Sequence, residues 1–216
     1  MQSAQTNMIK QQLRPTSVVN EDIIHLFEVL PREKFVPAHY ANFAYSDMQI
    51  PLPHGQRMFT PTEEGQILQA LKLKNHETVL EIGTGFGYLT AMLSKLAKKV
   101  ISLDIFPEFT KHAQTKLKEL NIKNVSLYTA NGYEGFPQNS PYDCIIVTGA
   151  TTSIPDELLL QLATQGRLFA LIGQETVQQA QIHKINAHQI RNVRFLFNTS
   201  LPNLIPNTPE RTHFIF

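Results

Sequence analysis

The chain has 216 residues, of which 42% are hydrophobic, and its formal net charge is +1. This length suits one α/β domain with an extension or two small domains, and the near-neutral charge gives no indication that a nucleic acid or an anionic membrane is a partner. No apolar run approaches the roughly 20 residues of a membrane span, the N-terminus lacks the apolar core of a signal sequence, and the single cysteine, Cys144, permits no disulfide within the chain, so we expect a cytoplasmic protein.

Residues 1–60 are predicted to form an N-terminal helical extension that ends in a lid. Helices are expected over residues 7–13 and 22–30. The apolar residues of the second helix recur at helical spacing: Ile23, Ile24, Phe27 and Leu30. The connector that follows, residues 31–61, is punctuated by prolines and is longer than an ordinary loop. Such long loops often cover a site or carry function.

Residues 61–216 are predicted to form a cofactor-binding domain in which helices and strands alternate. Thr60, Pro61 and Glu63 are typical of a helix start, with threonine at the cap, proline at the first position and glutamate three residues after the cap. This helix should end near residue 73. Further helices are expected over residues 88–97, 107–120 and 153–163, and strands over residues 78–82, 99–104, 125–129, 142–147 and 167–172. This alternation favours an α/β fold with a doubly wound parallel sheet.

The end of the chain has a different pattern. Residues 178–185 and 193–198 predict two late strands that form a hairpin with at least one antiparallel member. Residues 202–216 contain three prolines and show no clear period. With the five strands before them, the two late strands give a mostly parallel sheet.

A glycine-rich turn after the first predicted strand is the most informative motif. Gly83, Gly85 and Gly87 occupy alternate positions between that strand and a helix. Such a unit brings bare backbone N–H groups against a ligand at a helix N-terminus. Asp104 ends the next strand, where an acid can accept both hydroxyls of a ribose. Together the turn and the acid predict a nucleoside site.

The spacing within the turn distinguishes between nucleoside cofactors. The dinucleotide fingerprint is G-x-G-x-x-G, whereas this chain has G-x-G-x-G, preceded by Glu81. A carboxylate there would repel a pyrophosphate, but it would attract the cationic amino-acid end of S-adenosylmethionine, directly or through water. We therefore predict S-adenosylmethionine rather than NAD. The eight histidines are scattered and no His-Glu-x-x-His or paired cysteines occur, so no metal site is predicted.

At this point the chain resembles the class I S-adenosylmethionine-dependent methyltransferases and, more narrowly, the protein-L-isoaspartate O-methyltransferases. The likeness covers about residues 8–173. Four stretches carry it: QQLRP at 11–15, LPREKFVP at 30–37, EIGTG at 81–85, and NGYEG at 131–135 leading to YDCIIVT at 142–148. The second stretch is specific to this family, whereas the glycine segment is shared more widely. The resemblance implies a Rossmann-like, seven-stranded sheet with an N-terminal helical cap over the cofactor.

The resemblance also implies a set of cofactor-binding residues: Gln56, Glu81, Gly83, Thr84, Gly85, Asp104, Ile105, Asn131 and Gly132. Asp104 would take the ribose, and Ile105 would flank the adenine. Asn131 stands where the family has aspartate beside the adenine amine, and its side-chain oxygen can accept the same hydrogen bond. The alternative is that Asn131 is a turn residue after the third strand.

The chain departs from the family in the lid segment, residues 55–61. The family has Gly-Gln-Thr-Ile-Ser-x-Pro there, and its hydroxyl residue lies close to the reacting carboxylate. Here Phe59 occupies the hydroxyl position and Arg57 replaces a threonine. Three interpretations follow. Thr60 supplies the hydroxyl, Arg57 holds a carboxylate through a bidentate pair, or the acceptor is not an isoaspartyl peptide.

Three functions are therefore considered. The first is methyl esterification of an L-isoaspartyl carboxylate in damaged protein, which makes a protein or peptide the partner. The second keeps the cofactor but changes the acceptor to a small metabolite or another polypeptide group. The third is a module that binds S-adenosylmethionine without turnover. A carboxylate is already ionised at pH 7 and needs no general base, so an active enzyme requires mainly alignment of the reacting groups.

Overall fold

The computed structural model describes residues 2–174, 176–185 and 191–206. At the N-terminus, α1 (Gln2–Met8) runs directly into a π-helical turn, η1 (Ile9–Leu13), and α2 (Glu21–Val29) follows. The first helix thus begins at Gln2 rather than at residue 7. The Asn20 side chain caps α2, because its Oδ1 accepts the Ile23 N–H at 3.2 Å.

The proline-rich connector is ordered as three short 3-10 helices: η2 (Arg32–Phe35), η3 (Ala38–Phe43) and η4 (Pro53–Gly55). Pro31 and Pro37 precede the first two and Pro53 begins the third. The fixed φ of proline suits the start of a helical turn, and its missing N–H is not needed there. The prolines therefore define short elements instead of an irregular loop. The next helix, α3 (Pro61–Leu71), has the predicted start.

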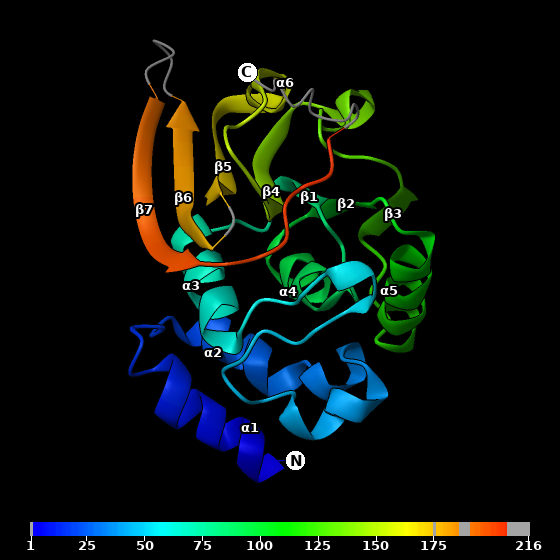
Figure 1. Ribbon diagram of the computed structural model, residues 1–216, viewed down its shortest axis with the longest axis vertical. Helices are drawn as coiled ribbons and strands as arrows, with labels where there is room; N and C mark the ends of the chain where they lie inside the picture. The colour runs from blue at the N-terminus through cyan, green and yellow to red at the C-terminus, as the bar shows by residue number, and fades with distance from the viewer. Residues whose placement is uncertain (1, 175, 186–190, 207–216) are drawn as a thin grey trace, which may run out of the picture.

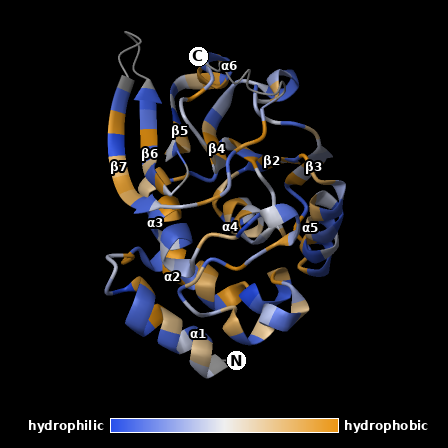
Figure 2. Ribbon diagram, in the orientation of Figure 1, coloured by the Kyte–Doolittle hydropathy of each residue, from blue (hydrophilic) through white to orange (hydrophobic). Residues whose placement is uncertain are grey.

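The described residues contain a seven-stranded sheet with the order β3-β2-β1-β4-β5-β6-β7. Its strands are β1 (Thr78–Ile82), β2 (Lys99–Asp104), β3 (Val125–Thr129), β4 (Tyr142–Thr151), β5 (Leu162–Gln174), β6 (Val177–Ile185) and β7 (Arg191–Thr199). The first five pair in parallel, and β6 and β7 pair antiparallel. The mostly parallel sheet and the closing hairpin are confirmed. In Figure 2, apolar and polar residues alternate in bands along β7.

Two hydrophobic cores cover the two faces of the sheet. On one face, alternate strand residues such as Val79 and Ile146 pack with α3, α4 (Tyr88–Leu96), α5 (Pro107–Glu119) and the N-terminal helices. On the other face, Leu80 and Ile145 pack against the short α6 (Asp156–Leu160) and the segments around it. Figure 1 shows the N-terminal helices stacked outside α3 and α4. These helices thus add a layer outside α3 and α4, whereas the predicted cap over the cofactor stays a prediction.

The helix predicted over residues 153–163 is wrong at its C-terminal end. Only Asp156–Leu160 is helical, and Leu162 already belongs to β5, where it pairs with Tyr142 of β4. Gly166 therefore lies inside a strand and does not end a helix. Pairing with β4 outweighs the local helical pattern here, because each added pair satisfies backbone groups that would otherwise be buried.

The segment after β7 turns back across the carboxyl end of β4 (Figure 1). Asn203 forms a parallel bridge with Ala150. The Leu204 N–H donates to the Ala150 carbonyl at 2.7 Å, and the Ala150 N–H donates to the Pro202 carbonyl at 3.0 Å. This return strap, residues 200–206, therefore reaches the edge of the sheet at which parallel strands place their ligands. The rest of the predicted aperiodic tail, residues 207–216, lies outside the described residues. No described helix is long and apolar enough to cross a membrane.

Candidate active site

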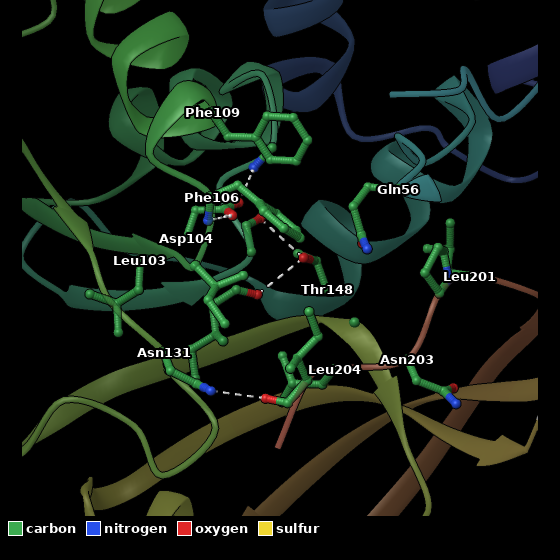
Figure 3. A pocket seen from close by; sticks show the side chains of 18 of the residues that line it. Gln56, Leu103, Asp104, Phe106, Phe109, Asn131, Thr148, Leu201, Asn203 and Leu204 are labelled. Carbon is green, nitrogen blue, oxygen red and sulfur yellow. Dashed lines mark hydrogen bonds between the residues drawn. The ribbon is translucent and has the colours of Figure 1, made fainter. Parts of the chain in front are cut away.

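A pocket opens at the carboxyl ends of β1, β2 and β4. Its lining includes eight of the predicted site residues: Gln56, Arg57, Gly83, Gly85, Asp104, Ile105, Asn131 and Gly132. Apolar walls come from Phe106 and Phe109 on one side and from the return strap on the other. Figure 3 shows Asp104 and Asn131 on one side of this first pocket and Leu201 on the opposite side. Residues remote in the sequence thus meet at the predicted nucleoside site.

A second pocket adjoins the first beneath the lid segment. The two share Leu52, Arg57, Gly83, Gly85 and Thr148. The second pocket extends to the start of α4 and to α3, and its further lining is Met58, Phe59, Glu64, Thr84, Phe86, Gly87, Tyr88 and Leu89. One elongated site therefore runs from the ends of β2 and β3, past the glycine turn, to the space below the lid.

The glycine turn lies against Thr148 at the junction of the two pockets. Gly83 has φ +99°, and a Cβ built on it would lie 2.0 Å from Thr148 Oγ1. This Oγ1 donates to the Ile82 and Gly83 carbonyls at 3.0 Å each, as Figure 3 shows. Sequence reasoning missed Thr148, although its place just after a predicted buried strand is typical of site residues in parallel sheets.

Asp104 is fixed by backbone donors at the end of β2. Its Oδ2 accepts the Gly85 N–H at 2.8 Å, and its Oδ1 accepts the Phe106 N–H at 3.0 Å. Burial raises the pKa of this carboxyl, and the two N–H donors oppose that rise. The acid is thus oriented by the same turn that opens the pocket. Lone pairs remain on both oxygens for ribose hydroxyls.

Asn131 lines the first pocket and also makes the hydrogen bond of a turn residue. Its Oδ1, which we expected to accept the adenine amine, accepts the Tyr133 N–H at 2.9 Å. Its Nδ2 donates to the Ile205 carbonyl at 3.1 Å and so ties the return strap to the end of β3. An aspartate could not donate this second bond. The departure from the family pattern therefore coincides with a contact to the strap.

Glu81 does not line either pocket. Its side chain is fully buried behind the glycine turn, where Oε2 accepts hydrogen bonds from Thr90 at 2.5 Å and Ser102 at 2.6 Å. Among the residues that the structure describes, no donor reaches Oε1. Burial raises the pKa of this carboxyl to about 7 against the effect of the two hydroxyl donors. The predicted direct contact with the amino-acid end of a cofactor is thus not available in this conformation. Thr84 also hydrogen-bonds to Ser102, at 2.6 Å.

Residues 50–58 fold into a hairpin-like loop that places Arg57 over the site. The Leu52 N–H donates to the Gln56 carbonyl at 2.8 Å, and the Met58 N–H donates to the Ile50 carbonyl at 2.9 Å. At the tip, His54 stacks on Phe106 with the ring centroids 4.1 Å apart. The Arg57 side chain is exposed and lines both pockets. Across the described part of the chain, no hydrogen bond or ion pair of Arg57 is found.

Phe59, at the family's hydroxyl position, is a core residue. It is 4% exposed, and its ring lies edge-on to Phe169 of β5 at 6.3 Å between centroids. Its carbonyl accepts Arg32 Nη2 at 2.6 Å. The phenyl group therefore fills space between the lid and the sheet. Phe59 also contributes to the lining of the second pocket.

Thr60 serves as the cap of α3 and lines neither pocket. Its Oγ1 accepts the Glu63 N–H at 3.2 Å, and its own N–H donates to Glu63 Oε2 at 2.7 Å. We expect Thr60→Ala to lower the free energy of unfolding by about 1 kcal/mol, the usual value of a lost cap, and to leave methyl-transfer rates within about twofold. Thr60→Ser should retain both the stability and the rate of the wild type. Denaturant unfolding and initial rates check this, and a large loss of rate at full stability would instead make Thr60 the missing hydroxyl.

Within the described ranges, no group of three or more histidine, cysteine or acidic side chains is arranged to hold an ion. Cys144 is buried in β4, and burial raises the pKa of its thiol to about 12. The two adjoining pockets thus form one site at the carboxyl ends of the strands, and Arg57, for which the described residues supply no ion-pair partner, lies at their junction.

Comparison with known proteins agrees with this geometry. The family model described as Protein-L-isoaspartate(D-aspartate) O-methyltransferase (PCMT) matches residues 3–200. The protein-L-isoaspartate O-methyltransferase of Aliivibrio salmonicida is 38% identical over 200 residues, which are 91% of this chain and 96% of that protein. The enzyme of that name from Gloeobacter violaceus is 37% identical over 172 residues, or 80% and 84% of the two chains.

Solved structures show the same fold. A protein-L-isoaspartate O-methyltransferase superposes with a TM-score of 0.79 at 23% identity, covering 96% of this chain and 67% of that one. A putative enzyme of this kind from Plasmodium falciparum, solved in complex with S-adenosyl-L-homocysteine, has a TM-score of 0.78 at 20% identity, with 94% and 97% covered. The Rossmann-like fold and the predicted family are confirmed, and the chain belongs to the protein-L-isoaspartate O-methyltransferase family.

Proposed function

We propose that this protein transfers a methyl group from S-adenosylmethionine to the free carboxylate of an L-isoaspartyl residue in a damaged protein or peptide. The observation that carries this function is the match of nearly the whole chain to the family, since relatives at 37–38% identity bear the name of this activity. The ester formed would collapse to a succinimide and so permit repair of the damaged residue.

The residues of the first pocket fit the nucleoside part of this cofactor. Asp104 offers carboxylate oxygens to a ribose, and Ile105, Phe106 and Leu204 form an apolar wall for a flat base. The positive φ angles of Gly83 and Gly85 leave bare backbone facing the pocket. When bound, S-adenosylmethionine supplies a methyl group that is activated by its sulfonium. The protein therefore has to hold the acceptor in line and exclude water.

Arg57 is the residue that we assign to the acceptor. It lies where the two pockets meet, it is exposed, and none of the described residues forms an ion pair with it. A guanidinium can hold a carboxylate through two parallel hydrogen bonds. This bidentate pair can orient the acceptor without the hydroxyl that Phe59 replaces. Alignment of this kind accounts for up to about 7–11 kcal/mol of a barrier.

The direct test is transfer of labelled methyl groups to an isoaspartyl peptide, run beside its normal aspartyl twin. We expect labelling of the isoaspartyl peptide alone. If the protein binds S-adenosylhomocysteine by calorimetry but labels neither peptide, then either the acceptor is another group or the protein binds the cofactor without turnover. If it binds no nucleoside cofactor at all, the assignment as a methyltransferase fails.

Substitution of Arg57 tests how the acceptor is held. Arg57→Gln should lower kcat/KM for the isoaspartyl peptide by roughly 10- to 100-fold, which is the factor for a lost hydrogen bond to a charged group. Arg57→Lys should give an intermediate loss, because it retains the charge but not the fork. Cofactor affinity should not change by more than about twofold. The matched control is Arg14→Gln, which removes another partly exposed arginine that lines neither pocket. Equal kcat/KM for the two glutamine variants would contradict the assignment.

A further inference from the structure

The acid expected near the amino-acid end of the cofactor, Glu81, is enclosed behind the glycine turn, yet another acid reaches the site. Of the carboxylates in the described lining of the two pockets, Asp104 belongs to the first and Glu64 to the second. Glu64 lies on α3, the helix that follows the lid segment, and it shares the lining of the second pocket with the start of α4. Its side chain is only 2% exposed, so its contacts decide what it can bind.

Arg32 holds Glu64 from one side. Arg32 Nη1 pairs with Glu64 Oε2, Nη2 donates to the Phe59 carbonyl at 2.6 Å, and the guanidinium carbon lies 4.9 Å from the centre of the Tyr88 ring. The side chain of Arg32 is itself fully buried. One guanidinium therefore connects α3, the lid segment and the first turn of α4. The carboxylate of Glu64 is fixed in position before any ligand arrives.

The second oxygen of Glu64 is available. Oε2 takes the bond from Arg32, and within the described residues no donor reaches Oε1. Burial raises the pKa of this carboxyl, and the charge of Arg32 acts in the opposite direction. A second cation at Oε1 would further favour the ionised form. The pocket thus presents one buried carboxylate with one oxygen unpaired.

Another part of the second pocket suits an anion. It is formed by Tyr88 and Leu89, in the first turn of α4, where backbone N–H groups are not used within the helix and the helix dipole favours negative charge. A ligand group with an ammonium and a carboxylate on one carbon therefore finds a complementary charge for each. The amino-acid end of S-adenosylmethionine has this pair, and it extends from a nucleoside placed in the first pocket.

We propose that Glu64 binds the ammonium group of the cofactor's amino-acid end, with Arg32 as the residue that positions it. This inference rests on the proposed function, because it takes S-adenosylmethionine as the ligand. It moves recognition of the amino-acid end from the strand β1, where the sequence suggested it, to the helix α3 that follows the lid. Lid position and cofactor affinity are then linked through Arg32, which contacts both Glu64 and the Phe59 carbonyl.

The test compares two ligands on each protein by calorimetry. S-adenosylhomocysteine carries the amino-acid end, and 5′-methylthioadenosine lacks it. We expect Glu64→Gln to lower the affinity for S-adenosylhomocysteine roughly 10- to 100-fold, the factor for a hydrogen bond to a charged group. The affinity for 5′-methylthioadenosine should change by less than about twofold. The matched control is Glu77→Gln. This substitution removes the charged partner of another buried arginine, Arg167, but Glu77 lines neither pocket. The ratio of the affinities for S-adenosylhomocysteine and 5′-methylthioadenosine should therefore equal that of the wild type.

The outcomes distinguish failure of the Glu64 assignment from failure of the proposed function. If Glu64→Gln weakens both ligands equally, or neither, the assignment of Glu64 is overturned. If the wild-type protein binds neither ligand, the proposed function itself is overturned. Should Glu64→Gln fail to fold, the desamino analogue of S-adenosylhomocysteine is measured on the wild-type protein. A loss of at least about tenfold relative to S-adenosylhomocysteine supports recognition of the ammonium, and equal affinity overturns it.

Discussion

Gly83→Ala should abolish cofactor binding and destabilise the fold. A Cβ at this position would lie 2.0 Å from Thr148 Oγ1, and φ is +99°, a conformation that L residues rarely adopt. The backbone strain costs roughly 1–2 kcal/mol, and the forced displacement of Thr148 costs roughly 1–3 kcal/mol more. Because the turn forms the floor shared by both pockets, its displacement should reduce affinity for S-adenosylhomocysteine by more than about 100-fold. Calorimetry and denaturant unfolding measure the two effects.

Another glycine, in the lid segment, allows the effect of backbone strain to be separated from that of a steric clash. Gly55 also has a positive φ, +68°, but a Cβ there would meet no atom within 4 Å. Gly55→Ala should therefore show only the backbone cost, about 1–2 kcal/mol, with cofactor affinity reduced by much less. If Gly83→Ala binds cofactor as well as Gly55→Ala does, contact between the turn and Thr148 is not what shapes the site.

Glu77→Gln should cost roughly 3–5 kcal/mol of unfolding free energy, because it leaves a buried guanidinium without its counter-charge. Arg167 Nη1 and Nη2 donate to Glu77 at 2.8 and 2.7 Å, and Arg167 Nε donates to the Leu71 carbonyl at 2.7 Å. The pair thereby joins β5 to the end of α3. Although burial opposes it, the hydrogen bond from Arg167 lowers the pKa of Glu77.

The pH dependence of this loss follows from that lowered pKa. The charged carboxylate stabilises the native state above the ordinary glutamate pKa of 4.5, and this contribution is lost as the pH falls through the folded-state value. The difference between wild type and Glu77→Gln should therefore shrink at acidic pH. As a control, Glu21→Gln breaks the exposed pair with Arg14 and should cost less than about 1 kcal/mol. Similar losses for both variants would show that burial of the Arg167 pair is unimportant.

The sequence predicted those parts of the molecule that depend on local patterns. The glycine turn, the acid at the end of β2 and the Thr60 cap all follow from short-range rules, and they are found as expected. The end of α6 was wrong because strand pairing between Tyr142 and Leu162 decides it, and such pairing has no local signal. The family resemblance supplied the number of strands and the cap.

The side chains that line the pockets were harder to predict than the glycine turn beneath them. Glu81 was expected to face the cofactor, but strand alternation directs it to Thr90 and Ser102 on the buried side. Thr148 and Glu64 were not anticipated, since each enters the site through packing between elements remote in the sequence. The division at residue 60 into an extension and a cofactor domain, the cytoplasmic location and the site roles of the residues stay predictions.

The return strap has a consequence for biosynthesis. Its residues 201–205 line the nucleoside pocket, and Asn131 holds it there through the Ile205 carbonyl. These are the last residues of that wall to leave the ribosome. A nascent chain that has exposed the glycine turn and Asp104 thus still has an open nucleoside pocket. Ligand-assisted stabilisation during translation must therefore wait until β7 has paired and the strap has crossed β4.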